Sequence, residues 1–83
     1  MRTEKARWIE LKRLADRGDN KALETLENEV IEAVEREGSL TAATESVGIG
    51  YHTVYAWLQP NRTLERVGKI LRESGFLASY GKH

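Results

Sequence analysis

Five side chains between residues 51 and 59 are of types that contact the edges of DNA base pairs. At helical spacing they share one exposed face, formed by Tyr51, His52, Tyr55, Ala56 and Gln59. A glutamine amide can pair with an adenine edge, a histidine can donate to a guanine acceptor, and a tyrosine or alanine can touch a thymine methyl. The face has no Arg, Lys or Asn, so we expect modest or shape-based readout. The alternatives are plain solvent exposure and a protein interface.

A second set of side chains is suited to binding phosphate. It comprises Ser39, Thr41, Thr53, Arg62, Arg66 and Lys69. Hydroxyl and cationic groups of this kind, helped by backbone amides at helix N-termini, hold a protein in register on a nucleic acid without reading its sequence. For the three basic residues, a solvated face is an equally good interpretation.

Catalytic and metal chemistry find little support in the sequence. There is no cysteine, which removes thiolate nucleophiles, thiolate metal sites and disulfides together. His52 and His83 do not make a metal set, no triad spacing surrounds His52, and no phosphate loop is present. We expect no catalytic residue, no metal and no cofactor, and a protein that is not an enzyme.

Two short helices around a three-residue turn are expected to position the base-contacting face. Ser39 can cap the first helix, Gly48 interrupts it, and helical periodicity resumes over residues 51–59 until Pro60. Small or apolar side chains are expected at the contact between the helices: Ala43, Val47, Ile49, Val54, Trp57 and Leu58. The pattern predicts a helix-turn-helix over residues 40–59.

Two further helices are expected before this unit. The first spans residues 3–17 and is closed by Gly18, and the second is capped by Asp19 or Asn20 and stops at Gly38. Trp8, like Trp57, lies in an apolar stripe and is expected to anchor the core. The outer face of the second helix is expected to be acidic, with Glu24, Glu27, Glu29, Glu32, Glu35 and Glu37.

One helix is expected after the central unit. Asn61 can cap it, Gly75 ends it, and its inward residues are expected to be Leu64, Val67, Ile70 and Leu71. Phe76, Leu77 and Tyr80 in the tail are expected to fold back on the core, with a brief extended segment as one form.

The expected fold class is therefore all-α, with about five helices in a single domain spanning residues 1–83. It consists of an N-terminal helical pair (1–37), the helix-turn-helix (39–59), a supporting helix (61–75) and a tail (76–83). The length of 83 residues leaves no room for a second core.

Charge is distributed unevenly although the net charge is zero. Residues 1–23 hold seven basic and four acidic residues, residues 24–45 one and seven, and residues 46–83 five and two. The acidic segment could therefore face away from a polyanion. No stretch resembles a membrane span or a signal peptide, so a cytoplasmic location is expected.

Three motifs carry a resemblance to a known family: GSLTAA at 38–43, VGI at 47–49 and TVYAWL at 53–58. Together they resemble the core of helix-turn-helix regulators of bacteria and phages. Continued through residues 59–76, the chain is similar to addiction-module antidote proteins and the wider repressor-like family. The resemblance implies a repressor-like arrangement in which the last helix is a support. Thr44 stands where the family usually has alanine, and its hydroxyl needs a local acceptor.

These observations favour sequence-specific binding of double-stranded DNA, with a role as a transcriptional repressor or other regulator. A homodimer is expected, because two half-sites would multiply a weak single contact. Two alternatives stay open: a phage-type architectural or packaging factor, such as an excisionase or small terminase subunit, and a protein-interaction module that does not bind DNA. The acidic face of residues 20–37 is a candidate surface for a protein partner.

Overall fold

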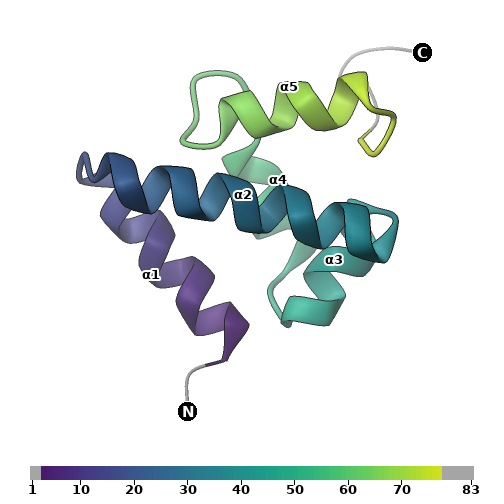
Figure 1. The fold of residues 1–83 in the computed structure, drawn as a ribbon, viewed down its shortest axis with the longest axis horizontal. Coiled ribbons are helices and arrows are strands. Elements are labelled where there is room, and N and C mark those ends of the chain that lie inside the picture. Colours follow the sequence, from purple (N-terminus) through teal and green to yellow (C-terminus); the bar gives the residue numbers. More distant parts are fainter. Residues whose placement is uncertain (1–2, 78–83) are drawn as a thin grey trace.

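The computed structural model describes residues 3–77, which form five helices and no strand. The helices are α1 (Glu4–Asp16), α2 (Asn20–Glu37), α3 (Leu40–Val47), α4 (Tyr51–Trp57) and α5 (Glu65–Glu73) (Figure 1). The expected all-α fold class is confirmed. No helix in this part of the chain is long and apolar enough to cross a membrane. Phe76 and Leu77 pack on the core, whereas Tyr80 lies outside the described residues.

Side-chain caps start the first three helices. Thr3 Oγ1 accepts a hydrogen bond from the Ala6 amide, and Asp19 Oδ1 accepts one from the Ala22 amide. Each satisfies a backbone N–H that has no partner within its own helix. Of the two residues expected to cap α2, Asp19 therefore does so. Gly38 ends α2 as expected.

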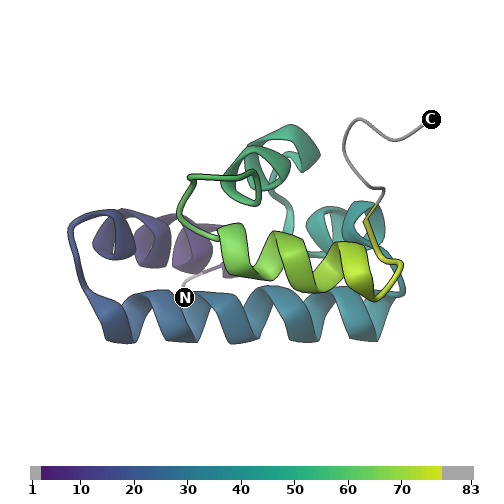
Figure 2. The same ribbon diagram turned by 90° about the horizontal axis from the view of Figure 1, so that it is seen from above.

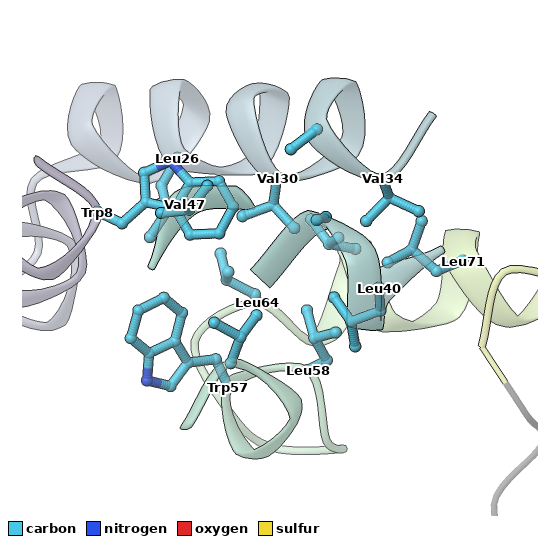
Figure 3. Packing of buried hydrophobic residues seen from close by; sticks show 14 of the residues in the cluster. Trp8, Leu26, Val30, Val34, Leu40, Val47, Trp57, Leu58, Leu64 and Leu71 are labelled. Carbon is cyan, nitrogen blue, oxygen red and sulfur yellow. The ribbon is translucent and has the colours of Figure 1, made fainter. Parts of the chain in front are cut away.

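Helix α2 is the longest of the described helices and packs against α1, α3 and α5. Its residues Leu26, Val30 and Val34 are fully buried and face side chains from the rest of the chain (Figure 3). Trp8 from α1 is 1% exposed and Trp57 from α4 is 8% exposed, so both tryptophans are core residues as predicted. A single apolar cluster therefore unites the five helices.

The predicted acidic outer face of α2 is wrong for Glu27. This residue is only 6% exposed, and its Oε1 accepts a hydrogen bond of 2.6 Å from Arg66 Nη2 of α5. Glu29 is half-buried and accepts two hydrogen bonds from Arg7 of α1. These two carboxylates lie on the flanks of α2, where neighbouring helices supply a cation. The remaining four glutamates are exposed.

The segment between α4 and α5 differs from the prediction. Helix α4 ends at Trp57 instead of Gln59, and α5 begins at Glu65, with Leu64 in the cap position. Asn61 is not a helix cap; it lies in the connecting loop with a φ of 66°. The Trp57 carbonyl accepts a hydrogen bond from the Leu64 amide, which closes this loop.

Helix α5 uses fewer apolar residues than expected. Leu64, Val67 and Leu71 are buried, but Ile70 is 38% exposed and does not face the core. Gly68 takes part in the contact instead, because a Cβ built at this position would lie 2.0 Å from the Leu58 carbonyl oxygen. Only a residue without a side chain lets α5 approach the end of α4 so closely. After α5, Gly75 adopts the expected left-handed conformation, one residue beyond the Ser74 cap.

Candidate nucleic-acid interface

The three-residue turn between α3 and α4 has the predicted form. Ser39 Oγ accepts from the Ala42 amide at the start of α3, and Gly48 ends the helix with a φ of 90°. The amides of Gly48 and Ile49 both donate to the Thr44 carbonyl, at 2.9 and 3.1 Å. Since both bonds require a left-handed residue after α3, a glycine is needed at position 48.

The contact between α3 and α4 is made by the small and apolar residues expected from the sequence. All are buried: Ala43, Val47, Ile49, Val54, Trp57 and Leu58. Thr44 is 1% exposed, and its Oγ1 donates to the Thr41 carbonyl at 3.0 Å. The threonine hydroxyl thus has the local acceptor that its burial requires.

Helix α4 projects from the molecule on the face opposite to α2. Figure 2 shows α2 along one edge and α4 beyond the other helices at the opposite edge. The side chains of Glu24, Glu32 and Glu35 are exposed on the outer surface of α2. Negative charge is therefore concentrated on the side of the molecule away from α4.

Aromatic rings cover the first turns of α4. Tyr51 and Tyr55 are half-buried and stacked, with ring centroids 5.6 Å apart and an interplanar angle of 19°. The exposed His52 meets Tyr51 edge-on at 5.5 Å. Both tyrosines also contact the core cluster. These three predicted base contacts therefore form one connected surface, and the packing of the two tyrosines on the core fixes its position.

Gln59, the last predicted base contact, is bound within the protein. Its Nε2 donates to the Tyr55 carbonyl at 3.0 Å, and its Oε1 accepts from Arg72 Nη2 at 3.4 Å. Gln59 and its neighbour Ala56 are half-buried. An adenine edge would have to replace at least one of these two hydrogen bonds of Gln59.

The predicted phosphate contacts fall into two groups. Ser39, Thr41 and Thr53 lie at or near the starts of α3 and α4; Ser39 is half-buried in its capping role, and the two threonines are exposed. The three cations, Arg62, Arg66 and Lys69, lie on or just before α5 and are all exposed. Arg66 and Lys69 line the same open groove of about 580 Å³, which Arg62 does not line.

The three cations differ in how free they are to bind an anion. Arg66 is paired with the buried Glu27, so part of its charge is already used inside the protein. Lys69 has no ion pair among residues 3–77. Arg62 lies close enough to Asp16 to lower the pKa of that carboxyl, although less than Lys12 and Thr63 do.

Sequence reasoning did not single out Lys12 and Arg72. Lys12 Nζ lies 5.5 Å from the centre of the Trp57 ring and 2.6 Å from Asp16 Oδ2. Arg72 of α5 reaches Gln59. The spacing of four residues between Lys12 and Asp16 is visible in the sequence, but nothing local indicates that either cation lies beside α4.

The described residues contain no group of three potential metal ligands from His, Cys, Asp and Glu. In the comparisons with known proteins, no family model, no curated protein and no solved structure matches the chain. The resemblance to repressor-like regulators therefore stays a prediction that rests on the motifs at residues 38–58.

Proposed function

We propose that this protein binds double-stranded DNA through α4, with α3 and α4 acting as a helix-turn-helix in a repressor-like arrangement. The observation that carries the proposal is the projection of α4 on the side opposite to the acidic α2 (Figure 2); this helix carries the exposed His52 and the half-buried Tyr51 and Tyr55. A helix that projects in this way can enter the major groove. The exposed carboxylates of α2 would then lie far from the phosphates.

In this proposal one face of α4 contacts the bases, and residues around it contact the phosphates. His52 and Tyr51 at its start, with Tyr55 and Ala56 along it, would lie toward the bases, and Gln59 would follow at its end. Thr41, Thr53 and the Ser39 hydroxyl would contact one stretch of backbone, and Arg62 and Lys69 another. Two such units in a homodimer would read half-sites about 34 Å apart, as suits a transcriptional repressor or other regulator.

The salt dependence of binding is the direct test of this function. Gel-shift titrations with a duplex of random sequence should show a logarithmic affinity that falls steeply and linearly with the logarithm of salt concentration. Replacing Arg62 and Lys69 together by glutamine should flatten this slope by about two units. The control is the double variant Lys21→Gln and Arg36→Gln, which removes the same charge from exposed positions on α2.

Arg66 is unsuitable for that test. Removing its guanidinium would leave the Glu27 carboxylate, 8% exposed at its side chain, without its cation. A buried charge without a partner is destabilising, so a weaker affinity could reflect a damaged fold. Arg62 and Lys69 have no such role in the described residues.

Sequence preference is tested on the aromatic face itself. Selection of bound sites from random DNA should give a consensus for the wild type, and Tyr51→Ala or Gln59→Ala should change that consensus more than the overall affinity. An equal loss on every sequence would assign these side chains to general binding and remove them from base readout.

A protein-interaction module is the second candidate, because one observation favours it. Helix α4 has no charged residue, and its surface is formed by two stacked tyrosines and a histidine. Aromatic surfaces of this kind are frequent in protein interfaces. If wild-type protein shows no salt-dependent binding to any duplex at low salt, DNA binding is excluded and this candidate takes its place.

A further inference from the structure

An open groove runs beside α5 close to the C-terminal end of α4. It is lined by Pro60, Glu65, Arg66, Lys69, Arg72 and Glu73, and its volume is about 580 Å³. Arg66 is neutralised by Glu27. Lys69 and Arg72 have no ion pair among residues 3–77. Among the described residues, Lys69 and Arg72 are therefore the unpaired cations of the groove, and Glu65 and Glu73 are its unpaired carboxylates.

Arg72 is held weakly in its present position. Its guanidinium lies over Gly68 and donates to Gln59 Oε1 at 3.4 Å, which is long for a hydrogen bond. Its Nε is buried and has no acceptor among the described residues. A buried donor without an acceptor is unfavourable, and an arginine prefers a planar, doubly bonded partner. The side chain would gain hydrogen bonds by turning toward an anion in the groove.

We infer that Arg72 binds a phosphate of the DNA backbone in this groove, and that it releases Gln59 when it does so. The inference rests on the proposed DNA binding through α4. A phosphodiester offers the two acceptor oxygens that a guanidinium can bind side by side, and Lys69 lines the same groove. Once Arg72 turns away, Gln59 Oε1 no longer accepts a hydrogen bond within the protein. It can then accept one from an adenine amino group.

Arg72 therefore links two kinds of contact. Binding of Arg72 to the DNA backbone comes first, whatever the DNA sequence. It then makes Gln59 available to contact a base. In the free protein, by contrast, Gln59 is occupied at both ends of its amide. This order of events lets Gln59 contact a base only where the backbone is already bound.

The test compares Arg72→Gln, Arg72→Lys and the wild type in gel-shift titrations over a range of salt concentrations. Arg72→Gln should reduce the slope of log affinity against log salt by about 0.9, the loss of one phosphate contact. Discrimination between a selected site and random DNA should persist, because Gln59 Oε1 then no longer accepts from Arg72, while Nε2 keeps its bond to the Tyr55 carbonyl. Arg72→Lys, which keeps the charge, should retain the wild-type slope, and Lys21→Gln on α2 serves as the control.

The opposite pattern overturns the inference. If Arg72 only holds Gln59 in place, Arg72→Gln lowers discrimination and leaves the salt slope unchanged. A wild type that binds with a steep salt slope shared by Arg72→Gln rejects this inference and leaves the proposed function standing. A wild type without salt-dependent binding rejects both.

A second measurement does not depend on the variants folding well. In NMR titrations of the wild type with a random-sequence duplex, the Arg72 Nε–Hε resonance and the Gln59 side-chain amide resonances should both shift. The Arg72 signal is assigned by its absence from the Arg72→Lys spectrum. If both sets of resonances stay in place while backbone signals of α4 shift, Arg72 does not bind the phosphate.

Discussion

Gly68 sets how closely α5 can approach the end of α4. Its Cα lies so near the Leu58 carbonyl that a Cβ would stand 2.0 Å from the oxygen and 3.0 Å from the carbonyl carbon. Both obstacles are backbone atoms, which cannot rotate away as a side chain can. The position of the loop that carries Gln59 therefore depends on the absence of a side chain at Gly68.

Gly68→Ala is expected to lower the free energy of unfolding by about 2 kcal/mol. Overpacking against backbone costs up to about 3 kcal/mol, and the better helix propensity of alanine returns about 1 kcal/mol. Urea unfolding followed by circular dichroism measures the change. Gly50→Ala is the matched control, because its φ of −63° suits alanine and its nearest neighbour would be Thr53 Oγ1 at 3.4 Å. Similar losses in both variants would contradict this account of Gly68.

Asp16 ties α1 to the loop before α5. Its carboxylate accepts hydrogen bonds from Lys12 Nζ at 2.6 Å and from Thr63 Oγ1. These two bonds, the one from Lys12 first, lower the pKa of Asp16 below its usual value. A lowered pKa in the folded state means that the ionised carboxylate stabilises the fold above the pKa of the unfolded chain.

The stabilising effect of Asp16 should disappear in acid. At about pH 7 the wild type should exceed Asp16→Asn in stability by less than about 1 kcal/mol, because the Asp16 side chain is 46% exposed. As the pH falls through the folded pKa, the difference should shrink to zero. Urea titrations at about pH 7 and about pH 2.5 measure it. Lys12→Gln should weaken the same pH dependence. If the stability difference between wild type and Asp16→Asn grew in acid, the stabilising role of the Asp16 carboxylate would be refuted.

Helix α3 and the turn after it depend on a single backbone conformation. Gly48 has a φ of 90°, and a Cβ there would meet nothing within 4 Å. Any cost of a side chain at position 48 is therefore conformational and does not come from crowding. This separates the turn from the Gly68 contact, where space alone is limiting.

Gly48→Ala should lower stability by about 1 to 2 kcal/mol, the cost of placing an L residue in the left-handed region. Gly48→Asn should lose less, because asparagine tolerates this conformation better. Urea unfolding of both variants checks the order. If asparagine and alanine were equally costly, the backbone conformation would not be the cause.

The residues that cap helices and form the turn could be predicted from the sequence. Asp19, Ser39 and Gly48 act within four residues of themselves, so their capping and turn roles can be read locally. Thr44 belongs with them, because its acceptor is the Thr41 carbonyl in the same helix. The sequence also indicated that the tyrosines and the histidine of α4 would lie on one face, and Val54 and Trp57 on the buried one.

Errors arose where a partner lies far along the chain. Glu27 was expected in solvent because Arg66, 39 residues away, could not be foreseen as its neighbour. Asn61 was expected to cap a helix, but the bond between Leu64 and Trp57 holds residues 58–64 in a loop. Gln59 was expected to be free, but Arg72 of α5 donates to it across the gap between the loop after α4 and α5.

In the whole molecule, the exposed glutamates of α2 lie on the side opposite to the proposed binding face on α4 (Figure 2). The Cα trace measures 18 Å along its shortest axis, which is vertical in Figure 2 and runs from α2 to α4. At physiological salt the field of a surface charge decays over about 8 Å. The exposed glutamates of α2 therefore lie about two screening lengths from a duplex on α4.

Removing two of these charges should hardly affect DNA binding. The double variant Glu32→Gln and Glu35→Gln is expected to change affinity less than twofold at about 150 mM salt, because screening is nearly complete at this separation. Gel-shift titration measures it. A gain of tenfold or more would mean that the acidic surface lies near the DNA and that α4 does not mediate binding.

The two tryptophans occupy different environments, which provides two optical reporters. Trp8 is 1% exposed and its indole Nε1 has no partner among residues 3–77, so its emission should be shifted to short wavelength and should change only on unfolding. Trp57 ends α4 beneath the Lys12 ammonium, at the edge of the core. Trp8→Phe would leave Trp57 as the single tryptophan, and its emission intensity should follow occupancy of the neighbouring surface, with no label attached to either molecule.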